Sequence, residues 1–238
     1  MEYVTPLQYI SHWESLGKVI LTNDGQTAML TLSGCRSCRP VLVGGLLDGI
    51  FLFEQLHFHW GPNDSMGSEH VIDGKRYSME AHLVYFNGRY RSFCDALYKQ
   101  DGLVVVAVLL RASESFNDWN PLVPIVDALE RIHNPYAKTA IPGDCLNGLR
   151  GLQIDRHYYT YHGSMTTTPY SENVRWLVYD TPVTVSSRQT AAFRELLQKT
   201  STEKLIPITS NFRPLQSNVA DDLVYVRDNA NSFQRSKL

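Results

Sequence analysis

The sequence predicts an α+β fold dominated by β-structure, in a single domain with a large, mostly antiparallel, twisted central sheet and a few short peripheral helices. Strand signals outnumber helix signals, and residues 103–110 (LVVVAVLL) form a continuous apolar run. The chain has 238 residues and contains no internal repeat or linker-like segment. Because β-rich folds of this length are commonly single domains, we assign residues 1–238 to one domain.

The predicted strands follow runs of apolar and β-branched residues. The run at residues 103–110 suits a strand that is buried on both faces, and residues 81–86 (AHLVYF) give the next strongest signal. The other expected strands cover residues 28–32, 50–60, 158–161, 174–179 and 205–208.

Two helices are expected. Ser186 to Gln189 has the pattern of a capping box, which predicts a helix to about Leu197 with Phe193, Leu196 and Leu197 on its apolar stripe. A second helix is expected from Asn120-Pro121 to Asn134-Pro135. We interpret both stripes as core contacts.

Composition excludes several classes of protein. The net charge is −2, from 22 basic and 24 acidic residues, and no run of like charge indicates a nucleic acid or an anionic membrane as partner. The hydrophobic fraction of 43% is typical of a protein with a packed core. No apolar run reaches the ~20 residues of a membrane span, and the first residues lack the pattern of a signal peptide.

The four cysteines, Cys35, Cys38, Cys94 and Cys145, are too few for a disulfide scaffold and leave the redox compartment open. Cys35 and Cys38 form an isolated C-x-x-C, which we interpret as two loop cysteines. The last three residues, Ser236-Lys237-Leu238, match a peroxisomal address, with an accidental polar tail as the alternative.

Two of the 8 histidines, His57 and His59, are separated by one residue in a predicted strand. Side chains at i and i+2 of a strand point to the same face, so two imidazoles could reach one ion. A packing or hydrogen-bonding role is the alternative. A catalytic zinc site needs a third ligand and an open position, and His82 in the neighbouring predicted strand is the best candidate. His70 lies between them and is interpreted as a hydrogen-bonded structural histidine.

The two predicted strands that carry the candidate ligands each have a polar residue two positions before one of them. Gln55 precedes His57 and Glu80 precedes His82, each on the face of its partner. Such groups accept the ring N–H and leave the other nitrogen for a metal.

Several longer motifs occur in order: HFHWG, GSEH, EAHLVYFN, YTYHGSMTTTP, ENVRW and SNFRP. In sequence and spacing they closely resemble the α-class carbonic anhydrases, from about Pro6 onward. The resemblance implies a zinc-dependent carbonate dehydratase, which hydrates carbon dioxide reversibly to bicarbonate and a proton by means of a zinc-bound hydroxide.

The resemblance also implies a role for individual residues. His57, His59 and His82 would bind Zn2+, with Gln55, Glu80 and the carbonyl of Asn211 as outer partners. Thr166 would accept a hydrogen bond from the hydroxide and donate one to Glu69, and Thr167 would contact bicarbonate. The apolar substrate pocket would comprise Val84, Val105, Met165, Val174 and Trp176. Met165 replaces an expected leucine, a swap that nearly conserves volume.

Three departures from the family are visible. Gln26 occupies the position of the proton-shuttle histidine, and glutamine cannot titrate, so slow turnover and rescue by imidazole buffers are expected. The resemblance begins near Pro6, so the given sequence lacks the family's usual N-terminal segment; it is either a fragment or a protein that tolerates the loss of an edge strand and apolar cover. Tyr170 stands where secreted relatives carry a disulfide cysteine, which favours a cytoplasmic protein; peroxisomal and secreted locations stay open.

We expect a monomer that acts on carbon dioxide and bicarbonate and is inhibited by anions and sulfonamides. The alternative is a catalytically weak or inactive carbonic anhydrase-like binding module. Such modules usually lack one of the zinc ligands, and here all three are present. A zinc peptidase is disfavoured because the chain contains no H-E-x-x-H helix.

Overall fold

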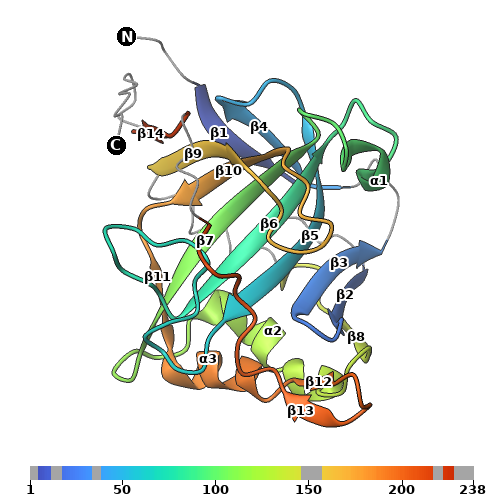
Figure 1. Ribbon diagram of the computed structural model, residues 1–238, viewed down its shortest axis with the longest axis vertical. Coiled ribbons are helices and arrows are strands. Elements are labelled where there is room, and N and C mark those ends of the chain that lie inside the picture. The colour runs from blue at the N-terminus through green and yellow to red at the C-terminus, as the bar shows by residue number, and fades with distance from the viewer. Residues whose placement is uncertain (1–4, 12–17, 34–38, 146–156, 217–221, 228–238) are drawn as a thin grey trace.

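The fold is described from a computed structural model that defines residues 5–11, 18–33, 39–145, 157–216 and 222–227. Within these residues, one twisted sheet of twelve strands forms the body of the molecule, in the order β14-β9-β10-β7-β6-β5-β3-β2-β8 (Figure 1). β1 pairs with β4, β4 also pairs with β5, and β11 extends the line of β10 along β7. The strands are β1 (Thr5–Ile10), β2 (Lys18–Asn23), β3 (Ala28–Ser33), β4 (Val41–Gly45), β5 (Phe51–Trp60), β6 (Met79–Asn87), β7 (Leu103–Ser113), β8 (Lys138–Ile141), β9 (Tyr158–Gly163), β10 (Val174–Tyr179), β11 (Val183–Ser186) and β14 (Val224–Val226).

The sheet is mixed but mostly antiparallel, as the sequence predicts. β7 runs parallel to β10 and β11, and the other ladders are antiparallel. A separate two-stranded sheet joins β12 (Leu197–Lys199) to β13 (Leu205–Pro207). All seven predicted strands are confirmed, although the expected strand at residues 205–208 ends at Pro207 and lies outside the main sheet.

Two apolar cores lie on opposite faces of the sheet. The continuous apolar run of β7 divides between them by strand alternation: Val104, Val106 and Val108 belong to the larger core, and Leu103 and Val105 to the smaller one. This division explains why the run has no polar alternation, because both faces of β7 are buried.

Helices cover the face with the larger core. α3 (Ser187–Arg194) begins with the predicted capping box between Ser186 and Gln189, and Phe193 is buried against Phe58 and Trp60. The expected extension to Leu197 is wrong, because the N–H of Leu197 donates to the carbonyl of His133 and starts β12.

The helix expected from Asn120 to Asn134 is also corrected. This region forms three short pieces, η2 (Asn120–Leu122), α2 (Val123–Val126) and η3 (Leu129–Ile132). Pro124 supplies a reason for the first break, because it has no N–H and its ring clashes with the carbonyl four residues earlier. α1 (Phe93–Ala96) was not predicted from the sequence.

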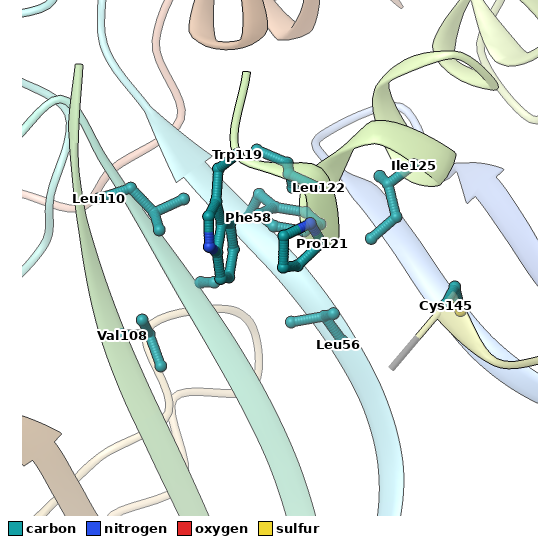
Figure 2. A pocket seen from close by; sticks show the side chains of 10 residues that line it. Leu56, Phe58, Val108, Leu110, Trp119, Pro121, Leu122, Ile125 and Cys145 are labelled. Carbon is teal, nitrogen blue, oxygen red and sulfur yellow. The ribbon is translucent and has the colours of Figure 1, made fainter. Parts of the chain in front are cut away.

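A small cavity lies between this helical cover and the sheet (Figure 2). Its volume is about 10 Å³ and its walls, which include Leu56, Phe58, Trp119 and Pro121, are apolar. Such a space holds about one water molecule, so the cavity is too small for a substrate.

Two sequence motifs fall outside the described residues, namely the Cys35/Cys38 pair and Ser236-Lys237-Leu238. Across the part of the chain that the structure describes, no helix is both long and apolar enough to cross a membrane.

Candidate metal centre

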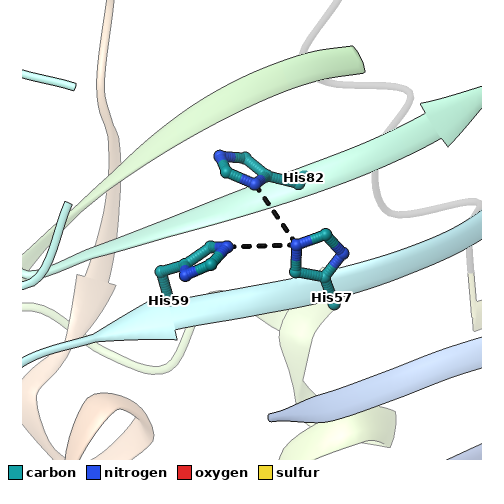
Figure 3. Close-up of side chains that lie close together, drawn as sticks. All are labelled: His57, His59 and His82. Carbon is teal, nitrogen blue, oxygen red and sulfur yellow. Dashed lines mark hydrogen bonds between the residues drawn. The ribbon is translucent and has the colours of Figure 1, made fainter. Parts of the chain in front are cut away.

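Three histidine side chains meet on the sheet face that carries the smaller core (Figure 3). His57 and His59 project from β5, and His82 lies directly opposite His57 on β6. Nε2 of His57 is 3.0 Å from Nε2 of His59 and 3.3 Å from Nδ1 of His82. All three residues are buried, with exposed fractions of 4%, 2% and 0% for His57, His59 and His82.

The nitrogen of each ring that faces away from the cluster is held by an acceptor. Nδ1 of His57 is 2.8 Å from Oε1 of Gln55, and Nε2 of His82 is 2.7 Å from Oε1 of Glu80. Nδ1 of His59 is 3.1 Å from the main-chain carbonyl of Asn211. A carbonyl or carboxylate oxygen requires a donor, so the outer nitrogens carry the protons and the inner nitrogens present lone pairs.

This donor set fits a zinc ion. With Zn–N bonds of about 2.0–2.1 Å, a tetrahedral site separates its nitrogens by about 3.3 Å, close to the spacing in the cluster. Three lone pairs directed at one another repel, and a cation between them would remove that repulsion. If His57, His59 and His82 held the ion, the protein would supply three ligands and leave one position for water, as catalytic zinc sites require.

Burial keeps the rings of His57 and His59 neutral. Burial, together with the neighbouring His59 and His82, holds the pKa of His57 well below its ordinary value. Burial also lowers the pKa of His59, although Glu69 acts in the opposite direction. Both rings are therefore unprotonated near neutral pH and able to bind a metal.

Glu80 anchors the outer side of the cluster. Its Oε2 accepts from the N–H groups of Glu69 (2.9 Å) and His70 (2.8 Å), and its Oε1 contacts Nδ1 of His70 (2.5 Å) as well as His82. Burial acts to raise the pKa of Glu80, but His70 and His82 hold it well below the usual range. His70 also contacts the hydroxyl of Tyr161 at 2.7 Å, so His70 has the hydrogen-bonded position expected from the sequence.

Glu69 lies beside the cluster, and only one of its two carboxylate oxygens accepts a hydrogen bond within the described part of the chain. Oε1 accepts from the main-chain N–H of Arg213 at 2.8 Å and lies 3.3 Å from Nδ1 of His59. Oε2 is buried without a hydrogen-bond partner, and no hydrogen bond joins Glu69 to Thr166 among the described residues. The expected Thr166 contact is thus not formed here, whereas the oxygen that would accept it is unsatisfied.

Four of the five predicted apolar pocket residues lie on this face of the sheet, and Met165 packs against them from the segment between β9 and β10. Val84, Val105 and Trp176 are register partners across β6, β7 and β10, and Val84 follows His82 by two residues. The indole ring of Trp176 is 4.9 Å from the imidazole of His82. Met165 and Val174 complete a buried cluster with these three side chains.

Comparison with known proteins decides the family. A family model described as eukaryotic-type carbonic anhydrase matches residues 2–225. The chain belongs to this family.

Individual carbonic anhydrases align over most of the chain. Carbonic anhydrase 7 of Mus musculus is 38% identical over 205 residues, which cover 86% of this chain and 75% of the relative. Carbonic anhydrase 3 of Homo sapiens is 35% identical over 216 residues, covering 87% and 81%. Carbonic anhydrase 1 of Oryctolagus cuniculus is 39% identical over 180 residues, covering 75% and 74%.

Gln26, for which the resemblance predicts the shuttle position, is exposed in the turn between β2 and β3. Oδ1 of Asp24 caps this turn by accepting from the N–H groups of Gln26 and Thr27, each at 2.8 Å. The turn thus presents a carboxamide, which does not titrate near neutral pH.

Two polar side chains around this centre, those of Thr27 and Asn211, make hydrogen bonds that could not be inferred from local sequence. The hydroxyl of Thr27 donates to the carbonyl of Phe58 at 2.5 Å and accepts from its N–H at 3.2 Å, between the two histidines of β5. The side-chain amide of Asn211 donates to the carbonyls of Gln26 and Phe58, both at 3.0 Å, and accepts from the N–H of Trp60 at 2.7 Å. The SNFRP motif pointed to the carbonyl of Asn211 alone.

Proposed function

We propose that this protein is a zinc-dependent carbonic anhydrase that hydrates carbon dioxide reversibly to bicarbonate and a proton. The observation that carries the proposal is the convergence of three imidazole nitrogens whose opposite ring nitrogens are each held by an acceptor. His57, His59 and His82 would hold the metal through Nε2, Nε2 and Nδ1. Zinc bound by three neutral ligands lowers the pKa of a coordinated water to about 7, a value known from carbonic anhydrase itself.

Glu69 and Thr166 would orient the nucleophile. The unsatisfied Oε2 of Glu69 is available to accept from the Thr166 hydroxyl, since Oε1 already accepts from the N–H of Arg213. A hydroxyl that donates to a carboxylate must use its lone pairs toward the metal side. Thr166 would therefore act as an acceptor beside the open coordination position, and Thr167 would contact the bicarbonate product.

Carbon dioxide would be held by the apolar cluster beside His82. This substrate has no charge and no hydrogen-bond donor, so an apolar wall is the surface that binds it without loss of hydration. Val84, Val105 and Trp176 supply the wall across three adjacent strands, and Met165 and Val174 flank it.

The proton would leave without help from residue 26. Gln26 offers no titratable group, so proton release would depend on external buffer and would limit turnover. An imidazole buffer supplies the missing acceptor.

Stopped-flow hydration of carbon dioxide, with zinc measured on the same sample and imidazole varied, tests the proposal. We expect one zinc per chain and a rate that rises with imidazole. The variant His82→Ala should lose zinc and fall to the buffer rate, whereas His162→Ala, which changes an exposed histidine on β9, should retain both.

Stoichiometric zinc without hydration would reject the enzyme and favour the binding-module alternative. A wild-type rate that ignores imidazole would reject the proposed role of Gln26 alone.

A further inference from the structure

Arg213 connects the two sides of the proposed Glu69–Thr166 contact. Its main-chain N–H donates to Oε1 of Glu69 at 2.8 Å. Its guanidinium Nη1 donates to Oγ of Ser164, two residues before Thr166, at 3.3 Å. Arg213 therefore contacts both the carboxylate of Glu69 and the segment that carries Thr166.

The guanidinium of Arg213 also lies over the ring of Tyr170. Its central carbon is 4.6 Å from the ring centroid, within the range of a cation–π contact. Arg213 is half-buried and Tyr170 is 47% exposed, so the ring forms the solvent side of this contact. Ordering the long side chain of Arg213 costs conformational entropy. The contact with Tyr170 adds to the hydrogen bond with Ser164 in offsetting that cost.

A turn with an unfavourable backbone conformation sets the position of Tyr170. Tyr170 has a φ of 59°, in the left-handed region that disfavours side chains with a Cβ, and its N–H donates to the carbonyl of Thr167 at 2.8 Å. The turn thus ties Tyr170 to the Thr166–Thr167 segment at a conformational cost, and the contact with Arg213 offsets part of that cost.

We propose that Tyr170 is a positioning residue for the hydration reaction, acting through Arg213. Its ring holds Arg213 in place, and Arg213 in turn aligns Glu69 with the Thr166–Thr167 segment. The inference rests on the proposed function, because the alignment matters for turnover only if Glu69 and Thr166 orient the nucleophile.

Substitution at Tyr170 in two backgrounds tests the proposal. Removal of the ring in Tyr170→Leu should reduce kcat/KM about fivefold, the size of a cation–π contact of ordinary strength, with zinc affinity unchanged. Tyr170→Phe keeps the ring and should retain wild-type kcat/KM.

In a Glu69→Gln background, Tyr170→Leu should cause no further loss of kcat/KM, because Tyr170 acts on the reaction through the position of Glu69. Tyr136→Leu, at an exposed tyrosine with a φ of 67°, controls for loss of a tyrosine at a left-handed position.

Urea unfolding of the same four metal-free proteins (wild type, both single variants and the double variant) supplies a readout that is independent of activity. The effects of Tyr170→Leu and Glu69→Gln on the free energy of unfolding should be non-additive. If the wild type fails to hydrate carbon dioxide, the proposed function fails, and the unfolding cycle still decides whether Tyr170 and Glu69 are coupled. Additive effects in the unfolding cycle, an equal fivefold loss in both backgrounds, or a Tyr170→Phe variant as slow as Tyr170→Leu would each overturn the positioning role.

Discussion

Oε1 of Glu80 lies 2.7 Å from Nε2 of His82, and the Glu80 carboxylate accepts each of the hydrogen bonds that its two oxygens make with the described residues. Four donors surround the carboxylate: the ring nitrogens of His70 and His82 and the N–H groups of Glu69 and His70. A carboxylate can satisfy all four, whereas a carboxamide has one acceptor oxygen and would turn two of its own donors toward other donors.

We therefore predict that Glu80→Gln weakens zinc binding about 10-fold to 100-fold, the range found when an outer partner of a metal ligand is removed. The measurement is competition with a chromophoric chelator. Glu172→Gln, at an exposed glutamate next to Asn173 and β10, serves as the matched control and should bind zinc like the wild type. Equal zinc affinity in the two variants would show that Glu80 does not hold His82 for the metal.

The centre of the sheet could be predicted from sequence because its strands are long and apolar. β5, β6 and β7 each carry a pattern that strand alternation explains, and the same alternation places His57 and His59 on one face. The pairing of His57 with His82 was expected only in outline, since register between strands is set by packing on both faces.

The strands at the periphery were missed for a physical reason. β1, β4 and β8 are short and partly exposed, so their residues lack a strong alternation. The sequence pattern does not predict β2 either, although Val19 and Leu21 are buried in it. The contacts of Thr27 with Phe58 and of Arg213 with Glu69 join segments that lie 31 and 144 residues apart. No local pattern carries information of that kind.

A histidine at position 26 should restore the missing proton acceptor. Gln26 is exposed in a turn whose backbone is fixed by Asp24, so a side chain can be exchanged there without burying a new group. We expect Gln26→His to raise kcat about tenfold in weak buffer, with KM unchanged. This gain is smaller than the roughly 10²–10⁴-fold effect of a positioned acid–base group, because water and residual buffer already accept some of the protons. Stopped-flow hydration at low and high imidazole measures the effect, which should disappear at high imidazole.

Gln216→His places an imidazole at another exposed glutamine and should leave the rate in weak buffer unchanged. A similar gain in both variants would mean that any added surface histidine suffices, and the assignment of position 26 as the shuttle position would then be wrong.

The stability of the metal-free protein should fall at mildly acidic pH because of His57. Its pKa in the folded protein lies well below the ordinary 6.5, with burial as the largest cause. Below pH 6.5 the unfolded chain therefore binds a proton that the folded protein rejects, so the free energy of unfolding decreases as pH falls toward the folded pKa. Above pH 6.5 this contribution is fully retained.

His70 acts in the opposite direction, since Glu80 raises its pKa in spite of burial, so the contribution of His57 must be isolated by substitution. Urea unfolding of metal-free wild type and His57→Gln across this pH range should show a smaller acid-induced loss in the variant. His162→Gln, at an exposed histidine, should follow the wild type. Parallel curves for the wild type and His57→Gln would contradict the lowered pKa.

Thr27 should stabilise the strand that carries two of the three histidines. Its hydroxyl accepts from the N–H of Phe58 at 3.2 Å, and both residues are buried. Thr27→Val keeps the shape of the side chain but leaves this N–H without an acceptor, which should reduce the free energy of unfolding by about 1–3 kcal/mol. Thr27→Ser retains the hydroxyl and should lose much less. The carbonyl of Phe58 stays satisfied in both variants because Asn211 also donates to it.

Since Phe58 lies between His57 and His59, the loss in Thr27→Val should extend to the metal. We expect weaker zinc binding in Thr27→Val than in Thr27→Ser, measured by chelator competition on proteins whose urea unfolding has been recorded. A Thr27→Val protein that unfolds more easily but binds zinc as tightly as Thr27→Ser would show that the hydroxyl supports the sheet without helping to place the two histidines.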